Sequence, residues 1–351
     1  MLDVLVVGGG PRGLAHIGAW PQAGGRVVAV AEADPSRRQQ LEVEGLRTFE
    51  TLSEAIAHLP AIGLVDVCTP PQFHKDIVIE ALQHDRHVLS EKPFVMDLAE
   101  AREIEGVAAV SKGRVAVMHN WLGLRAVREL RQRIQQDRLG RVFAAHCLWL
   151  QDHNRDTQGI RDPNHWVHSL AGGRIEETAP HILYTLIALL QDTEMTVRSA
   201  VFSKRTSYPW VVADTVAATL ASERSTATFF LSYAMERHDH CAFTAVGPQS
   251  AWRADVGTGV VEPFGLHYND RGKRASLERV EKLGEGIARR TAIGMGTGLR
   301  ALRHPAENGD VWLMREVVRS IETGSAPPVT LADAIATVRM TRELCDRLSA
   351  R

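Results

Sequence analysis

The N-terminal stretch Leu2-Asp3-Val4-Leu5-Val6-Val7-Gly8-Gly9-Gly10-Pro11-Arg12-Gly13 decides the fold of this chain. Its first six residues have the apolar pattern of a buried strand, and glycine then occupies positions 8, 10 and 13. This G-x-G-x-x-G spacing allows a tight turn, close approach of backbone to a pyrophosphate, and close packing of the next helix on the strand. The phosphates would bind the free N–H groups at the helix start. We therefore predict a dinucleotide site that includes Gly8, Gly10, Pro11, Arg12 and Gly13.

An acidic residue follows the second apolar run, residues 26–31. Glu32 lies directly after that run, about 20 residues beyond the glycines, where such sites bind the adenosine ribose hydroxyls. Asp34 is expected to cap the helix that follows it instead. A carboxylate at this place repels a 2′-phosphate, so NAD is favoured as the cofactor. Arg37 and Arg38 lie close enough to leave NADP possible.

Strands continue to alternate with helices through the first third of the chain. A strand at 64–68 ends in Thr69-Pro70-Pro71, a helix with His74 in its first turn follows, and a strand at 87–89 leads into Glu91-Lys92-Pro93. The alternation predicts a doubly wound parallel sheet that binds ligands at the carboxyl ends of its strands. Residues predicted at that edge, as cofactor contacts, are Thr69, Pro70, His74, Glu91 and Lys92. From spacing alone, His74 is equally well an ordinary first-turn histidine.

Length and composition restrict the class of protein. A chain of 351 residues predicts two domains, which we place at 1–120 for dinucleotide binding and 121–351 for substrate binding and oligomerisation. Lys and Arg number 41 against 42 Asp and Glu, which argues against a nucleic-acid partner. The four cysteines show no metal-ligand spacing and indicate reduced thiols. Without an export signal or a membrane-length apolar run, we expect a cytoplasmic protein with no membrane partner.

The remaining two-thirds predict a C-terminal α/β domain. A helix at 124–137 precedes a long strand at 141–150, and later β-rich runs at 196–204, 212–221, 226–235 and 241–247 indicate a large, mainly antiparallel sheet. Residues 271–304 are rich in arginine and glycine and poor in strand pattern. We interpret them as an insertion or long loop, a mobile connection being favoured over a lid or an intersubunit arm.

The stretch from Gly172 to His181 carries the second group of chemically informative residues. Two glycines precede a helix on which Glu177 and His181 stand four residues apart, and therefore on one face. The helix continues as an apolar run to Leu190, which indicates burial. An imidazole and a carboxylate near the start of a buried helix suit proton transfer, because histidine titrates near neutral pH. Both residues are predicted to be catalytic.

A zinc centre is the competing interpretation of the histidines. The pairs His165-x-x-His168 and His238-x-His240, with Glu177 and His181, could supply nitrogens and a carboxylate. A glycine turn separates the first pair from the second group, which weakens this reading. We expect His165-Trp166 and Asn120-Trp121 to line a sugar-sized pocket, because tryptophan faces and polar edges suit a polyol ring.

These motifs together resemble the Gfo/Idh/MocA oxidoreductases. The resemblance rests on the glycine loop, the acid after the second strand, Thr69-Pro70-Pro71-x-x-His74, and above all Glu91-Lys92-Pro93. It spans nearly the whole chain, since the segment 324–330 and the helix after it also fit. In the glycine-rich D-x-x-x-H-x-x-D motif of the family, His181 matches the histidine and Glu177 falls at the first aspartate. Tyr184 falls where a second aspartate is often seen, and we expect it to bind a substrate hydroxyl or to pack.

The resemblance implies a metal-free mechanism that uses Lys92 and His181, a cis bond before Pro93, and homodimers or homotetramers formed through the C-terminal sheet. We expect an NAD(P)-dependent oxidoreductase that transfers a hydride between nicotinamide and a secondary alcohol of a sugar, inositol or related polyol. One alternative is an NAD-retaining lyase-like or glycosidase-like member with transient oxidation and no net redox change. The other is a non-catalytic dinucleotide-binding protein. Retention of Lys92 and His181 speaks against the second alternative, since a binding module needs neither.

Overall fold

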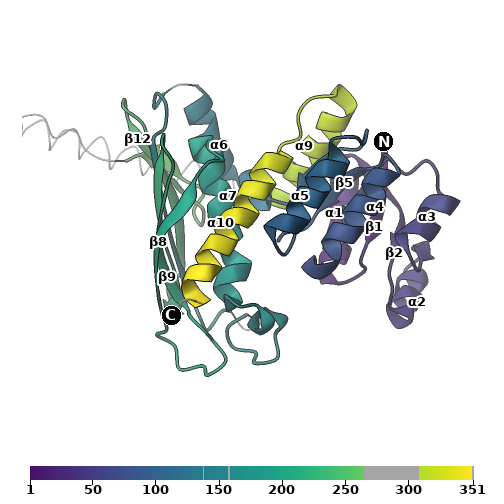
Figure 1. Ribbon diagram of the computed structural model, residues 1–351, viewed down its shortest axis with the longest axis horizontal. Coiled ribbons are helices and arrows are strands. Elements are labelled where there is room, and N and C mark those ends of the chain that lie inside the picture. Colours follow the sequence, from purple (N-terminus) through teal and green to yellow (C-terminus); the bar gives the residue numbers. More distant parts are fainter. Residues whose placement is uncertain (137, 157–158, 265–307, 350–351) are drawn as a thin grey trace, which may run out of the picture.

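The computed structural model of the chain describes residues 1–136, 138–156, 159–264 and 308–349. The stretch 271–304 lies outside these ranges, so its interpretation as a long loop stays a prediction. The described residues form a Rossmann domain and a second domain built on a large sheet, with helices between the two sheets (Figure 1).

The Rossmann sheet has six strands in the order β3-β2-β1-β4-β5-β6, and every neighbouring pair is parallel. The predicted doubly wound parallel sheet is confirmed, with the strand order reversing at β1 and β4. Its elements are β1 (Leu2–Val7), α1 (Pro11–Ala23), β2 (Gly25–Ala31), α2 (Pro35–Val43), β3 (Thr48–Phe49), α3 (Leu52–His58), β4 (Leu64–Val67), the 3₁₀ turn η1 (Pro71–Phe73), α4 (His74–Gln83), β5 (His87–Ser90), α5 (Leu98–Ala108) and β6 (Val115–Val117).

Local sequence explains where these elements start. Val4, Leu5 and Val6 of β1 are fully buried, as the apolar run predicts. Asp34 caps α2 by accepting hydrogen bonds from the backbone of Ser36 and Arg37, at 2.8 and 3.0 Å. Such caps fix the helix starts, and hence the loops at the carboxyl edge of the sheet.

The second sheet has seven strands in the order β13-β12-β11-β7-β10-β9-β8. It is mainly antiparallel, as predicted, with one parallel pair formed by β7 and β10. The helices α6, α7 and α10 lie on the side that faces the Rossmann domain (Figure 1). The elements are η2 (Asn120–Gly123), α6 (Arg125–Gln135), β7 (Ala144–Asp152), η3 (Trp166–Ser169), α7 (Gly173–Leu190), β8 (Thr196–Ser203), β9 (Thr215–Ala221), β10 (Thr226–Met235), β11 (His240–Val246), β12 (Ala251–Asp255), β13 (Val261–Pro263), α9 (Gly309–Thr323) and α10 (Leu331–Ser349).

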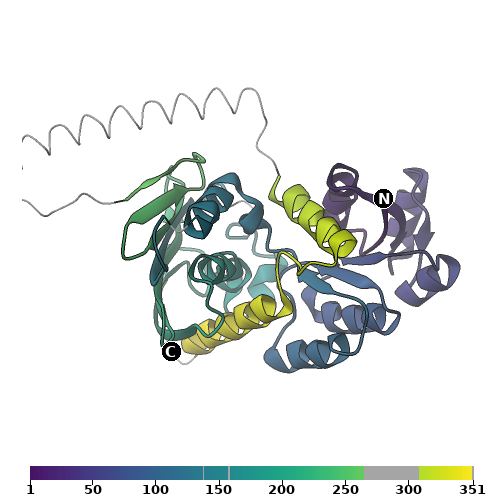
Figure 2. The same ribbon diagram turned by 90° about the horizontal axis from the view of Figure 1, so that it is seen from above.

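The two C-terminal helices join the domains. α9 packs against α1 and η2, and Figure 2 shows it beside the first domain, whereas α10 packs on α7 and also reaches α5. Close approach of α9 to η2 needs glycine at 309, because a Cβ there would overlap the carbonyl oxygen of Asn120. The last described helices therefore contact both domains, and the division of the chain at residue 120 stays a prediction.

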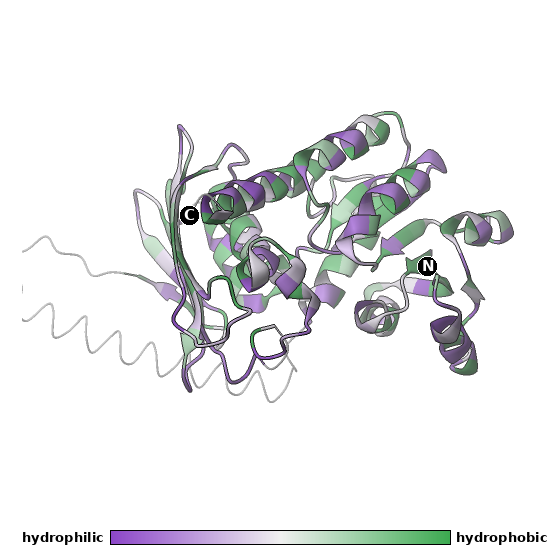
Figure 3. Ribbon diagram, turned by 60° about the horizontal axis from the view of Figure 1, so that its bottom comes forward, coloured by the Kyte–Doolittle hydropathy of each residue, from purple (hydrophilic) through white to green (hydrophobic). Residues whose placement is uncertain are grey.

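The helices carry both hydrophilic and hydrophobic residues along their length (Figure 3). In the parts of the chain that the structure describes, no helix is long and apolar enough to cross a membrane.

Candidate active site

The glycine loop between β1 and α1 leaves no room for a side chain at Gly8 or Gly13. Gly8 has φ +99°, and a Cβ there would lie 2.9 Å from the carbonyl oxygen of Cys68. A Cβ on Gly13 would overlap the carbonyl oxygen of Gly8. Pro11 begins α1, so the free N–H groups of its first turn stand at the carboxyl edge of the sheet, where a pyrophosphate would bind.

Glu32 braces this loop from the end of β2. Its carboxylate accepts hydrogen bonds from the backbone N–H groups of Gly9 (2.7 Å) and Asp34 (2.9 Å), and Arg37 lies 3.8 Å from it. Within the described residues, the buried Thr69 hydroxyl, at the end of β4, has no hydrogen-bond partner. The tight loop, the acid after β2 and this unpartnered hydroxyl fit a dinucleotide at the switch point of the sheet. Pro70 follows Thr69 and directly precedes η1.

Glu91 is buried directly behind Lys92. Its carboxylate accepts hydrogen bonds from Arg12 Nε (2.7 Å) and from its neighbour's backbone, Lys92 N (2.9 Å), and lies 3.1 Å from His16 Nε2. Burial alone would raise the pKa of Glu91, but hydrogen bonding and charge from His16 and Arg12 lower it well below its usual range. The ionised carboxylate therefore ties the glycine loop to the Glu91-Lys92-Pro93 stretch. The Lys92–Pro93 bond is cis, as the resemblance implied.

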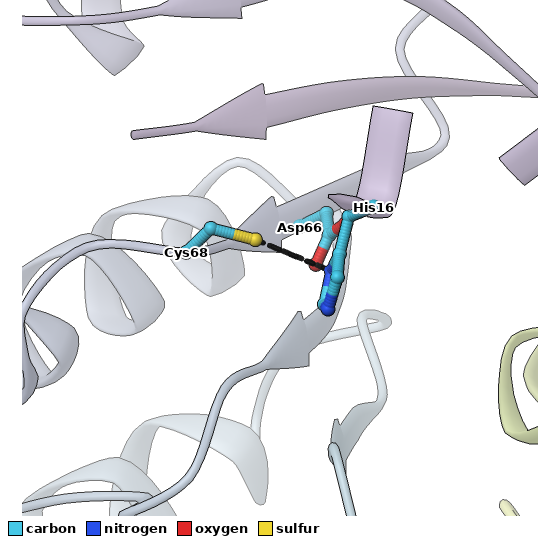
Figure 4. A group of neighbouring side chains, drawn as sticks. All are labelled: His16, Asp66 and Cys68. Atoms are coloured by element: carbon cyan, nitrogen blue, oxygen red, sulfur yellow. Dashed lines mark hydrogen bonds and ion pairs between the residues drawn. The ribbon is translucent and has the colours of Figure 1, made fainter. Parts of the chain in front are cut away.

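His16, Asp66 and Cys68 form a buried group below Glu91. His16 Nδ1 lies 2.9 Å from Asp66 and 3.2 Å from the Cys68 sulfur, and Figure 4 shows the thiol directed at the imidazole. Burial alone would lower the pKa of His16, but the charge of Asp66 raises it well above its usual value. Burial raises the pKa of Cys68 to about 12, so the thiol keeps its proton. A charged imidazole between two carboxylates holds Glu91 in place.

The same three residues have the chemistry of a metal site. Among the described residues, they alone form a group of at least three His, Cys, Asp or Glu side chains with ligand atoms within 4.8 Å of one another. Asp66 is also engaged by the Trp20 indole N–H, at 2.7 Å, so hydrogen bonds already satisfy the group. The zinc set considered from the sequence, with His165, His168 and His181, does not converge in this way. Absence of metal stays a prediction.

His74 supports the sheet edge from within the core. It is fully buried, and its ring nitrogens lie 2.8 Å from the carbonyl oxygen of Thr69 and 3.0 Å from that of Pro93. Burial lowers its pKa, although these carbonyl contacts oppose the change. His74 thus holds together the two loops that follow β4 and β5. Direct contact with the cofactor stays a prediction.

Lys92 and Glu177 form an ion pair between the domains. Lys92 Nζ pairs with one carboxylate oxygen and lies 3.3 Å from the Glu177 carbonyl oxygen, while Arg174 pairs with the other carboxylate oxygen. Burial alone would raise the pKa of Glu177, but the charges of Lys92 and Arg174 lower it to about 2. Arg174 is itself held by Asp156, at 2.8 Å. Glu177 is therefore ionised, and its hydrogen bonds orient Lys92 rather than His181.

His181 is oriented by Tyr184 and Trp121 instead. Its Nδ1 lies 2.6 Å from the Tyr184 hydroxyl, and its ring stacks on Trp121 with centroids 4.9 Å apart. Trp149 also belongs to this aromatic group, and its ring centroid lies 4.4 Å from that of Trp121. Burial and the charge of Lys92 lower the pKa of His181 well below its usual value. The imidazole is therefore neutral near pH 7 and can accept a proton.

The other residues predicted to bind substrate lie in different settings. Asn120 bonds Asp310 at 2.9 Å and lies 3.3 Å from the Tyr184 hydroxyl, so both side chains have protein partners. His165 and Trp166 lie at the start of η3, just before α7, and Trp166 is exposed. Among the described residues, no hydrogen bond, ion pair or ring contact links His165 or Trp166 to Lys92 or His181. Their role in binding substrate stays a prediction.

Sequence reasoning missed several residues that organise this site. Arg174 stands three residues before Glu177, a spacing that pairs charges on a helix and could have indicated its partner. Asp310, at the start of α9, gave only the signal of an acid in a first helical turn. His16 stands four residues after Arg12 in α1, and nothing local in the sequence pairs it with Asp66.

Comparison with known proteins identifies the family. A family model described as "Oxidoreductase family, NAD-binding Rossmann fold" matches residues 2–119, and a model of the "GFO/IDH/MocA C-terminal domain" matches residues 127–255. The chain belongs to the Gfo/Idh/MocA oxidoreductase family. Its N-terminal domain is the NAD-binding Rossmann domain of that family.

Relatives of this Gfo/Idh/MocA member include the 1,5-anhydro-D-fructose reductase of Ensifer adhaerens, 30% identical over 180 residues, 50% of this chain and 52% of that protein. The inositol 2-dehydrogenase of Renibacterium salmoninarum is 27% identical over 165 residues, 46% of this chain and 48% of that protein. The chain thus spans about half the length of each of these relatives.

Solved structures of low sequence identity share the whole fold of this family member. A levoglucosan dehydrogenase in complex with NADH and levoglucosan superposes with a TM-score of 0.73 at 16% identity, over 99% of this chain and 97% of that one. The WlbA dehydrogenase of Bordetella pertussis, in complex with NADH and UDP-GlcNAcA, also gives 0.73 at 16% identity, over 99% and 96% of the two chains.

Proposed function

We propose that this protein is an NAD-dependent oxidoreductase that transfers a hydride between nicotinamide and a secondary alcohol of a sugar, inositol or related polyol. One observation carries the proposal: Lys92, from the dinucleotide edge of the parallel sheet, pairs with Glu177 of α7, and its charge acts on His181, which stands one turn further along the same helix. A purely dinucleotide-binding protein has no use for a neutral imidazole and an ammonium brought together from two domains.

The dinucleotide site supplies the redox partner. When bound, NAD accepts or donates the hydride at its nicotinamide ring. The glycine loop offers backbone N–H groups that would bind the pyrophosphate, and Glu32, at the end of β2, would bind the adenosine ribose hydroxyls. Thr69 offers its unpartnered hydroxyl at the adjacent strand end.

His181 serves as the proton acceptor for alcohol oxidation. Its Nδ1 is hydrogen-bonded to Tyr184, which leaves Nε2 to take the proton of the substrate hydroxyl. The hydride leaves the carbon that bears this hydroxyl. Lys92 donates a hydrogen bond to the developing alkoxide oxygen, and Glu177 fixes the ammonium in place. In the reverse direction His181 returns the proton to a reduced carbonyl.

The substrate class is supported by the surroundings of His181 and by the relatives. Trp121 and Trp149 offer aromatic faces beside the imidazole, which suit the apolar face of a sugar ring. Relatives are named for 1,5-anhydro-D-fructose and for inositol, and one solved structure of the same fold holds levoglucosan. These compounds share a ring with secondary hydroxyl groups.

A panel of sugars, anhydrosugars and inositols tests the proposal, scored by absorbance of reduced nicotinamide with NAD and NADP side by side. We expect turnover with at least one ring polyol and a preference for NAD. Absence of turnover with every compound, together with absence of dinucleotide binding, would overturn it. Product formation with retained cofactor and no net reduction would indicate the lyase-like chemistry, which no observation here favours.

We also propose that the outer face of the seven-stranded sheet binds a second copy of the chain. Strand pairing aligns Val201, Ala217, Phe230 and Leu148 in one row across four strands. Val201 is 64% exposed and Phe230 is 36% exposed, so the row is apolar and open to solvent. An apolar row on a sheet face is typical of a self-complementary dimer interface.

A further inference from the structure

The Tyr184 hydroxyl lies between three groups and has only one proton to donate. It accepts a hydrogen bond from the backbone N–H of Trp121 at 3.1 Å, and it lies 2.6 Å from His181 Nδ1 and 3.3 Å from Asn120 Oδ1. A hydroxyl donates once and accepts twice. If its proton points to Asn120, the hydroxyl oxygen is left to accept a hydrogen bond from His181 Nδ1–H. The direction of this one proton therefore decides which nitrogen of His181 carries hydrogen.

Asp310 fixes which way the Asn120 amide points. Its carboxylate lies 2.9 Å from Asn120 Nδ2, and a carboxylate can only accept a hydrogen bond there. The NH₂ group must face Asp310, so the amide oxygen must face Tyr184. Arg12, in the first turn of α1, lies 3.3 Å from the other carboxylate oxygen of Asp310 and forms an ion pair with it. The amide is thus locked as an acceptor for the tyrosine.

We propose that Asp310 and Asn120, acting through Tyr184, hold His181 as the Nδ1–H tautomer. The basic lone pair is then on Nε2, where it can take the substrate proton. This inference rests on the proposed function for its catalytic meaning, although the tautomer itself can be observed without turnover. Asp310, Asn120 and Tyr184 are positioning residues in this scheme, and His181 is the catalytic residue. The chain of contacts starts at Arg12, so it joins the phosphate-binding loop to the proton acceptor.

The surroundings support a fixed tautomer. Tyr184 is 1% exposed, and burial raises its pKa well above the usual value, so the phenol keeps its proton. Its ring stacks on His119 with centroids 4.1 Å apart and an interplanar angle of 9°. Burial lowers the pKa of His119 to about 3, which leaves that neighbour uncharged. Phenylalanine at position 184 would keep this stacking and remove only the hydroxyl.

Nitrogen NMR of the ¹⁵N-histidine-labelled full chain at neutral pH tests the tautomer, with the His181 signals identified by their loss in His181→Gln. We expect the wild-type imidazole to show a protonated Nδ1 and an unprotonated Nε2. In Asn120→Ala the hydroxyl proton has no competing acceptor and turns to Nδ1, so the ring proton should move to Nε2. Wild-type protein protonated at Nε2, or an unchanged pattern in Asn120→Ala, would overturn the proposal.

Tyr184→Phe provides a second variant if Asn120→Ala does not fold. Here too Nδ1 loses its acceptor, and we expect the proton on Nε2 with kcat lower by about 100-fold and an unchanged KM. Retention of the Nδ1–H pattern in Tyr184→Phe would refute the scheme. Tyr208→Phe removes a hydroxyl from a half-buried tyrosine in the loop before β9 and should change neither readout. A wild-type protein that shows the Nδ1–H tautomer but turns over no compound of the polyol panel would count against the proposed function instead.

Discussion

Replacing Glu177 by glutamine removes the carboxylate that Lys92 and Arg174 share, and leaves two cations side by side between the domains. The size of the effect follows from the pKa of Glu177, which lies at about 2 against an ordinary value of 4.5. Each pKa unit corresponds to about 1.4 kcal/mol, so the ionised carboxylate is stabilised in the folded protein by about 3 kcal/mol. We expect Glu177→Gln to lower the free energy of unfolding near pH 7 by about that amount.

The contribution of Glu177 to the free energy of unfolding depends on pH. The folded-state pKa of Glu177 lies below the unfolded value, so its contribution is complete above about pH 4.5 and is lost as the pH falls toward 2. The stability difference between wild type and Glu177→Gln should therefore be largest at neutral pH and shrink through that window. Urea unfolding followed by tryptophan fluorescence at several pH values measures it.

Glu105→Gln is the matched control, because Glu105 is exposed on α5 and should change stability by less than about 0.5 kcal/mol. If Glu177→Gln were no less stable than Glu105→Gln at neutral pH, the ion pair would not hold the domains as described. A loss of equal size at every pH would likewise refute the electrostatic cause.

Three further predictions concern the cofactor loop and the open sheet face. Gly13→Ala should abolish NAD binding in a fluorescence titration, because its Cβ would overlap a loop carbonyl oxygen, whereas Gly18→Ala, with nothing within 4 Å, should bind normally. Glu32→Ala should weaken NAD binding about tenfold and narrow the preference over NADP, since the carboxylate that repels a 2′-phosphate is gone; an unchanged ratio of the two Kd values would contradict its role. Phe230→Glu should convert the oligomer to monomers in analytical ultracentrifugation, whereas Val43→Glu, at an exposed position of α2, should not. Identical masses for the two variants would exclude this sheet face as the interface between copies.

Much of the first domain could be predicted because its signals are local. The apolar run of β1, the glycine spacing and the cap at Asp34 each act within a few residues, so they specify strand, turn and helix without knowledge of the rest. The family resemblance, rather than a local signal, leads us to expect Lys92 and His181 in one site. The details of that site depend on how the domains pack.

The partners of the site residues could not be predicted, because they come from distant parts of the chain. Asp310 reaches Asn120 across 190 residues, through a close approach of α9 to η2 that needs glycine at 309. From the sequence, Tyr184 fitted either a substrate contact or a packing residue, and nothing there indicated that its hydroxyl lies 2.6 Å from His181 Nδ1. Spacing on one helix paired Glu177 with His181, yet the stronger attraction of an ammonium from the other domain determines where that carboxylate points.

Turnover and cofactor affinity of Lys92→Met, measured on one preparation with the best substrate of the polyol panel, test the central claim most directly. Methionine keeps an unbranched apolar stem and removes the ammonium that Glu177 holds beside His181. We predict a Kd for NAD within about twofold of wild type and a loss of kcat on the order of 1,000-fold. Wild-type turnover in Lys92→Met would contradict the account.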